Sequence, residues 1–168
     1  AAAVIGEPVP LAPWFAMLER EGRPLFSCDR ATLLGEVQKL AVDAMRRVGE
    51  IIPVTAVPLV CSAIQTFDAE FISRVALVER MEEMRGSLLH HGRWVLQPQE
   101  EPGEALDRAY DLLRLRRVIA RDGAGYVVLP RGRELISYYA NSISHLLGEF
   151  EGAVRARDAL PVYAVVDV

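Results

Sequence analysis

Hydrophobic residues recur at three- and four-residue spacing along most of the chain, which is the spacing of amphipathic helices. The first clear stripe consists of Leu33, Val37, Leu40, Ala44 and Val48. Asp29 precedes it and can accept hydrogen bonds from the exposed amides of a first helical turn, while Gly49 and Pro53 follow it. The pattern therefore predicts a long helix with one apolar face that begins near residue 29.

Three further helices are predicted before residue 116. Thr55 begins a short one that is apolar nearly all round and hence central, with Pro58 tolerated in its first turn. Asp68 is predicted to cap the next helix, whose inward face carries Phe71, Val75, Val78, Met81 and Met84. A Pro- and Glu-rich loop over residues 97–104 leads into the last of the three. Its apolar side consists of Leu106, Ala109, Tyr110 and Leu113.

Two β-prone runs then flank the turn sequence of residues 122–125, Asp-Gly-Ala-Gly, and predict a hairpin over residues 117–129. The glycines are expected to supply the positive φ that a tight turn needs. Pro130 closes the hairpin, and a last helix is predicted to run to about Leu147, before Gly148. Helices followed by a hairpin and another helix give the order of a winged-helix domain. The predicted fold class is thus mainly α with a small β hairpin, in a winged-helix-like helical domain.

A helical wheel divides that last helix into two faces. One face is apolar and consists of Ile136, Tyr139, Ile143, Leu146 and Leu147. The opposite face is a polar stripe formed by Glu134, Tyr138, Asn141 and His145. Because Tyr, Asn and His suit hydrogen bonding in a partly buried contact, the stripe is predicted to dock onto a neighbouring domain; a ligand site is the alternative.

Charge changes the picture in one region. The 168 residues carry a net charge of -4, which argues against a surface that follows a nucleic-acid backbone throughout. A local basic edge is nevertheless present, consisting of Arg114, Arg116, Arg117, Arg121, Arg131 and Arg133. This basic edge can meet nucleic acid, anionic lipid headgroups or the phosphates of an acyl carrier. The alternative is a solvated helix face whose arginine stems cover apolar surface.

No catalytic or metal centre is predicted. Cys28 and Cys61 have neither metal-ligand nor disulfide spacing and are interpreted as inert core thiols. His90 and His91 are adjacent, so on a helix they point about 100 degrees apart and suit a helix end better than a shared metal ion. No cofactor is expected.

The start of the chain, which has no initiator Met, suggests a piece of a longer protein. An apolar run over residues 1–5 breaks at Gly6 and is predicted to be the last strand of a preceding domain. Residues 1–28 are then the end of that domain and a connector with a short helical run at residues 14–18. Residues 29–148 form the helical domain, and residues 149–168 a tail with a late strand. No apolar run approaches the roughly 20 residues needed to span a bilayer.

Four motifs in order resemble the carboxy-terminal region of membrane-associated glycerol-3-phosphate acyltransferases. Residues 138–147 resemble the Tyr-Tyr-x-Asn-x-x-x-His-Leu signature of that family. Residues 6–9 look like its Gly-Glu-Pro turn, residues 44–48 and 53–55 like the helix and the Thr-Pro-Val-Thr junction that follow, and the hairpin lies where the family carries one. The likeness covers roughly residues 4–148; Ile52 and the tail depart from the pattern.

The resemblance implies transfer of an acyl group from acyl-CoA or acyl carrier protein to glycerol-3-phosphate, in phospholipid biosynthesis at the cytoplasmic face of a membrane. The family's catalytic His-x-x-x-x-Asp pair and its Phe-Pro-Glu-Gly segment are absent from this chain. The resemblance also implies that the preceding domain is an α/β acyltransferase domain. We therefore expect a non-catalytic part that docks on this domain of its parent, peripheral to an anionic membrane surface. The alternative is a winged-helix module that binds nucleic acid or protein, although Asp107 and Asp111 are unfavourable on a DNA-reading helix.

Overall fold

The computed structural model describes residues 5–24 and 26–148. Most of the predicted first strand and the whole predicted late strand lie outside these residues, while residues 6–10 are extended without forming a strand. Backbone contacts divide the chain into two compact units, Ala1–Ile52 and Pro53–Val168. Each unit is described by itself. The boundary predicted after residue 28 refers to the domains of a longer parent and stays a prediction.

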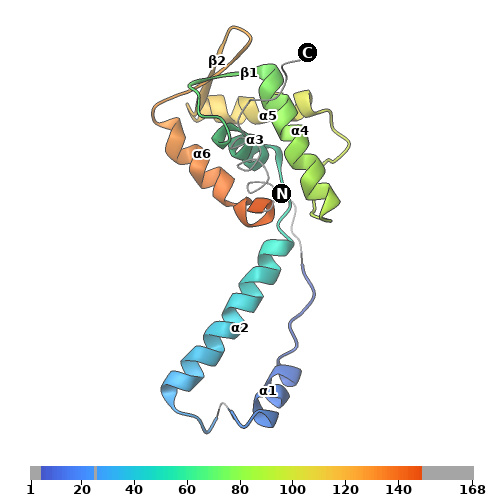
Figure 1. Ribbon diagram of the computed structural model, residues 1–168, viewed down its shortest axis with the longest axis vertical. Helices are drawn as coiled ribbons and strands as arrows, with labels where there is room; N and C mark the ends of the chain where they lie inside the picture. The colour runs from blue at the N-terminus through green and yellow to red at the C-terminus, as the bar shows by residue number, and fades with distance from the viewer. Residues whose placement is uncertain (1–4, 25, 149–168) are drawn as a thin grey trace, which may run out of the picture. The chain divides into compact units, whose positions relative to one another are not determined.

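The first unit contains two helices, α1 (Leu11–Arg20) and α2 (Arg30–Glu50) (Figure 1). The predicted cap of α2 is confirmed, because an Asp29 carboxylate oxygen accepts hydrogen bonds from the backbone amides of Ala31, at 2.9 Å, and Thr32, at 3.1 Å. Within α2, Glu36 is buried and accepts hydrogen bonds from the guanidinium of Arg23 and, at 2.7 Å, from the amine of Lys39. This carboxylate ties the segment between the helices to α2.

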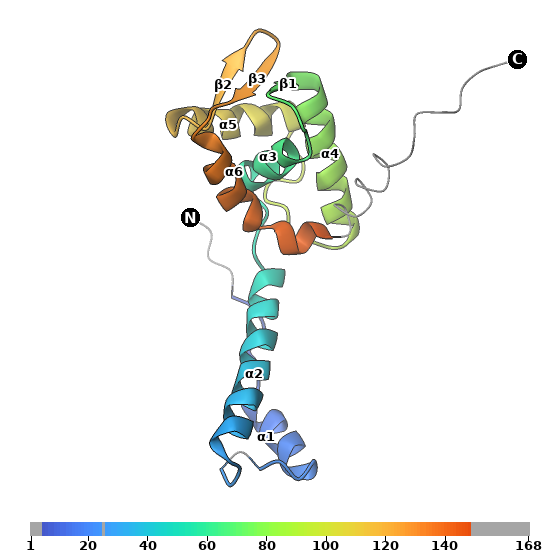
Figure 2. The same ribbon diagram turned by 60° about the vertical axis from the view of Figure 1, so that its left-hand side comes forward.

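The second unit is built around α3 (Ala56–Gln65), as its apolar sequence predicts. Six of its ten residues are buried, and it packs against three other helices: α4 (Arg74–His90), α5 (Pro102–Leu115) and α6 (Gly132–Asn141). Figure 2 shows these helices around α3. The predicted inner side of α5 is confirmed, since Leu106, Ala109 and Leu113 are all buried.

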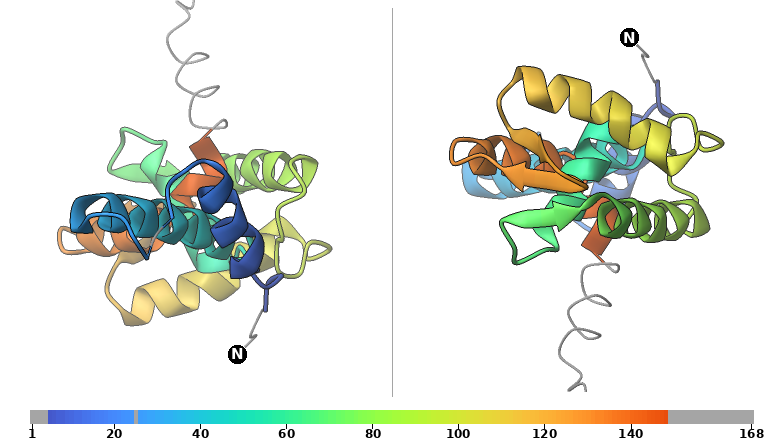
Figure 3. Two further views of the ribbon diagram at one scale, coloured as in Figure 1. Left: turned by 90° about the horizontal axis from the view of Figure 1, so that it is seen from below. Right: turned by 90° about the horizontal axis from the view of Figure 1, so that it is seen from above.

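Three strands, rather than a hairpin alone, complete the unit. The predicted hairpin is present as β2 (Ile119–Asp122) and β3 (Gly125–Val128), and β1 (Phe71–Ser73) pairs antiparallel with β3 to give the sheet order β1-β3-β2. The right-hand view of Figure 3 shows β1 beside the hairpin. The prediction of a helix that begins at Asp68 is wrong, because α4 begins at Arg74. Its cap is Ser73, whose hydroxyl accepts a hydrogen bond from the Ala76 amide at 3.1 Å.

The physical reason for this correction is the free edge of the hairpin. Backbone groups along β3 need partners, and residues 71–73 supply them in register, with Phe71 opposite Val127. Phe71 and Val75 are consequently 47% and 67% exposed instead of facing inward as predicted. Met81 and Met84, further along α4, are buried as predicted.

The two turn glycines have different roles. Gly123 adopts a φ of +52, as the turn prediction requires. Gly125 has no positive φ, because it is part of strand β3. A Cβ at this residue would overlap the carbonyl oxygen of Ile72 and the ring of Phe71. Glycine is needed at residue 125 for close approach of β1 to β3, not for backbone conformation.

The predicted last helix is interrupted. α6 ends at Asn141, residues 142–143 form a turn, and residues 144–148 are helical again. The Ser142 hydroxyl donates to the Tyr139 carbonyl at 2.7 Å, and the Ser144 hydroxyl donates to the Asn141 carbonyl at 3.1 Å. Serine hydroxyls that bond to the backbone in this way compete with helical hydrogen bonds, which accounts for the break.

Candidate functional site

The polar stripe of α6 keeps its two-faced character across the break. Glu134, Tyr138, Asn141 and His145 are all exposed, and Tyr138 is 71% exposed. On the other side Ile136, Ile143 and Leu147 are buried in the core. The structure thus leaves all four potential hydrogen-bonding side chains exposed, and their role in docking or ligand binding stays a prediction.

The six arginines of the basic edge are all exposed and come from the end of α5, from β2 and from the start of α6. Two of these segments touch at Gly132, where a Cβ would overlap the carbonyl group of Val118. Arg117 precedes Val118 and Arg131 precedes Gly132, so this packing brings the backbones of the two basic segments together.

Arg121 differs from the other members because it belongs to a polar network that the sequence did not reveal. Arg74 donates to both carboxylate oxygens of Asp107, at 2.7 and 2.9 Å, and to the Tyr126 hydroxyl at 2.9 Å. Arg121 reaches Asp107 at 3.3 Å, and its guanidinium lies 5.1 Å from the centroid of the Tyr110 ring. The hydrogen bond to Asp107 is the largest cause that raises the pKa of Arg74. The network joins α4, α5 and the hairpin.

The residues considered for catalysis or metal binding differ in burial and in their place in the fold. Cys61 is buried, and desolvation raises the pKa of its thiol to about 12, so the thiol stays protonated at neutral pH. Cys28 is half-buried and thus not the core thiol that was predicted. His90 ends α4 and His91 is its carboxy-terminal cap. Among residues 5–24 and 26–148, no three His, Cys, Asp or Glu side chains gather as a metal site.

The predicted stripe of α2 shares Val37, Ala44 and Val48 with an apolar surface of this helix whose exposure the sequence did not reveal. Leu34 is 57% exposed, Val37 46% and Val48 49%. Together with Ala41 and Ala44 they recur at alternating three- and four-residue steps, the spacing of a helix that packs lengthwise on another element. The opposite face carries ion pairs of Asp43 with Arg46 and Arg47. We refer to Leu34, Val37, Ala41, Ala44 and Val48 as the α2 seam.

Comparison with known families agrees with the motifs. A family model described as the glycerol-3-phosphate acyltransferase C-terminal region matches residues 3–149. The chain belongs to this family. The match confirms the resemblance drawn from the four motifs and spans both units, from before α1 to the end of the described chain. No solved structure matches the chain. Within the described residues, no helix is long and apolar enough to cross a bilayer.

Proposed function

We propose that this chain is the non-catalytic carboxy-terminal part of a glycerol-3-phosphate 1-O-acyltransferase and that it docks on the acyltransferase domain through the α2 seam. Its family supports the first half of the proposal. The exposed α2 seam carries the second half. Acyl transfer from acyl-CoA or acyl carrier protein to glycerol-3-phosphate, for phospholipid biosynthesis, is the activity that the docked domain would support.

The α2 seam has the properties of an interface rather than of a solvated helix face. Its 21-residue helix is about 32 Å long, and the seam runs along most of that length. Contiguous apolar surface of this kind on a soluble protein usually marks a contact site. A helical or sheet surface of the acyltransferase domain can bury the seam, while the charged opposite face of α2 remains in water.

Binding measurements with matched substitutions test the docking surface. Val37 lies in the α2 seam, whereas Val42, which is 63% exposed, lies about 140 degrees around the helix from it. With the acyltransferase domain expressed separately, Val37→Glu should weaken the complex by at least about tenfold, because a carboxylate would be buried without a partner. Val42→Glu should leave the affinity unchanged. Sedimentation velocity measures both complexes, and equal weakening by the two variants would refute docking through the seam.

The order of elements in the second unit favours a winged-helix arrangement. Helix, strand, two helices and a hairpin follow one another, and the sheet order is β1-β3-β2. In such a domain α5 would be the DNA-reading helix. Its exposed surface carries Asp111, whose charge would repel phosphates, and Asp107, which is already paired with Arg74 and Arg121. These residues favour a role in protein contact over DNA binding.

A second candidate function is contact of the basic edge with an anionic membrane surface, which would place the chain peripheral to the cytoplasmic membrane. Leu115, among the arginines at the end of α5, is 76% exposed, and a combination of arginines with an exposed apolar side chain suits the interface of an acidic bilayer. Co-sedimentation with vesicles containing phosphatidylglycerol should decrease with added salt and with Arg116→Gln/Arg117→Gln. Equal binding to neutral vesicles would contradict this role.

A further inference from the structure

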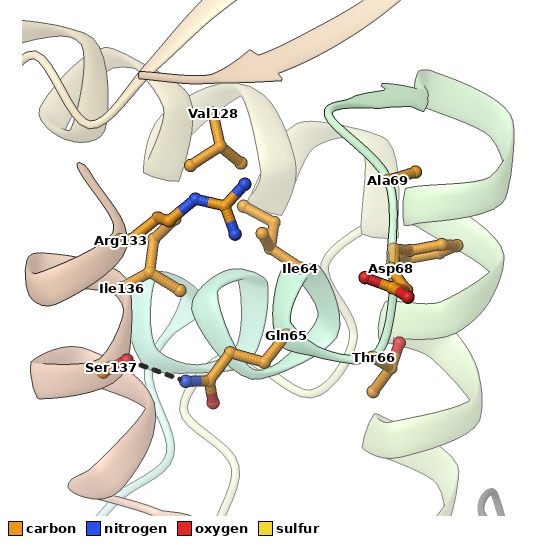
Figure 4. Close-up of a pocket in the computed structure, with 10 residues that line it drawn as sticks. Ile64, Gln65, Thr66, Asp68, Ala69, Val128, Arg133, Ile136 and Ser137 are labelled. Atoms are coloured by element: carbon orange, nitrogen blue, oxygen red, sulfur yellow. Dashed lines mark hydrogen bonds between the residues drawn. The ribbon is translucent and has the colours of Figure 1, made fainter. Parts of the chain in front are cut away.

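A hollow in the second unit is separate from the α2 seam. It lies between the end of α3, the loop over residues 66–69, the end of β3 and the first turns of α6 (Figure 4). Its volume is about 440 Å³, within the range of about 300–1,000 Å³ in which small-molecule sites are found. The buried side chains of Ile64 and Ile136 form part of its wall.

Arg133 supplies a cation with unused donors. Figure 4 shows its guanidinium pointing into the hollow from α6. The described residues give it neither an ion pair nor a hydrogen bond, in contrast to Arg74, which binds Asp107, and Arg108, which binds Glu100. A guanidinium offers five N–H donors in a planar fork that matches phosphate oxygens. An anionic group is therefore the chemistry that this wall fits.

The Asp68 carboxylate suits hydroxyls. Across the hollow from Arg133, it faces the same space (Figure 4). The Gln65 side-chain amide donates to the Ser137 hydroxyl at 3.2 Å, and its oxygen points away from Arg133, so Gln65 borders the hollow without offering an acceptor to it. Carboxylate oxygens accept hydrogen bonds from alcohols, whereas Asp68 would repel a second anionic group on the ligand.

We propose that this hollow binds a small phosphate monoester that carries free hydroxyl groups. Arg133 binds the phosphate, Asp68 accepts hydrogen bonds from the hydroxyls, and the apolar wall contacts the carbon chain. Glycerol-3-phosphate has this chemistry and serves as the probe. The proposal does not depend on docking, because all of the residues involved lie in the second unit.

Calorimetric titration of the full chain with glycerol-3-phosphate, inorganic phosphate and glycerol tests the site. Glycerol-3-phosphate should bind with a Kd of about 1 mM or below, at least about tenfold tighter than inorganic phosphate, and glycerol should not bind measurably. Absence of saturable binding of glycerol-3-phosphate at ten times that concentration would overturn the proposal. Equal affinity for inorganic phosphate would also overturn it, because the hydroxyls would then contribute nothing.

Two arginines provide a matched pair of variants. Arg133→Gln should weaken glycerol-3-phosphate binding at least about tenfold, since the phosphate loses a charged, two-pronged partner. Arg131→Gln removes the same charge from an exposed neighbour that does not line the hollow, and it should weaken binding less than about twofold. An unchanged thermal unfolding midpoint shows that Arg133→Gln folds. Equal effects of the two substitutions would show that only overall charge matters and would refute the site.

Discussion

The helices α2 and α3 are both rich in apolar residues, yet they differ in how many of their residues are buried. In α3, six consecutive residues from Leu59 to Ile64 are buried by the other helices of its own unit. In α2, which is twice as long, only Glu36 and Gly49 are buried. The comparison indicates that the second unit has a core of its own, whereas α2 carries apolar side chains that remain exposed, which is the observation behind the proposed docking.

The largest effect should come from truncating the core of the second unit. Leu77 of α4 is fully buried, so Leu77→Ala should lower the free energy of unfolding of that unit by about 2–5 kcal/mol. Leu34→Ala, in the α2 seam, should change the free energy of unfolding of the first unit by less than about 0.5 kcal/mol because the side chain is already exposed. Urea denaturation is followed by Trp94 fluorescence in a Trp14→Phe background for the second unit, and by Trp14 fluorescence in a Trp94→Phe background for the first. Similar losses for both variants would contradict the contrast between the units.

A pair of glycine substitutions sharpens the same contrast. Gly132→Ala should destabilise the second unit by about 1–3 kcal/mol, because a Cβ would overlap the backbone of Val118. Gly35→Ala, within α2, meets no atom within 4 Å and should instead stabilise its helix by about 0.5–1 kcal/mol. Thermal unfolding should therefore shift in opposite directions. A stabilising effect of Gly132→Ala would contradict the close contact between Gly132 and the backbone of Val118.

The smallest effect should be the pH response of the α2 cap. Hydrogen bonds from the Thr32 hydroxyl and amide and from the Ala31 amide lower the pKa of Asp29. Because the folded pKa is lower, the stabilisation is fully present above the unfolded value of about 3.9 and is lost as the pH falls through the folded pKa. Helical circular dichroism should decline in this acid range more in the wild type than in Asp29→Asn, which caps without titrating. Identical pH profiles would contradict this role of Asp29.

The elements that the sequence predicted correctly have local signals. Asp29 and the spacing from Leu33 to Val48 located α2, and Gly123 located the hairpin turn. Strand β1 was missed because its three residues have no pattern of their own, and their pairing with β3 depends on residues far along the chain. The break after Asn141 depends on serine hydroxyls that bond to the backbone, although serine is also common within helices.

The candidate sites were less predictable than the fold. The spacing predicted a stripe that shares Val37, Ala44 and Val48 with the α2 seam, but it did not single out Leu34 or Ala41, and spacing cannot show whether an apolar surface is covered. Arg133 was recognised as basic, whereas its position opposite Asp68 results from packing of α6 against the end of α3. The network of Arg74, Asp107 and Tyr126 likewise joins residues from three separate elements, for which local sequence holds no signal.

The most direct test of docking is an acylation assay that recombines the two parts of the enzyme. The acyltransferase domain is supplied separately, with radiolabelled glycerol-3-phosphate and an acyl donor, and acyl incorporation is measured with and without this chain. We predict no turnover by this chain alone, at least tenfold stimulation of the acyltransferase domain by the wild-type chain or Val42→Glu, and none by Val37→Glu. Turnover by this chain alone, or equal stimulation by both variants, would contradict the account.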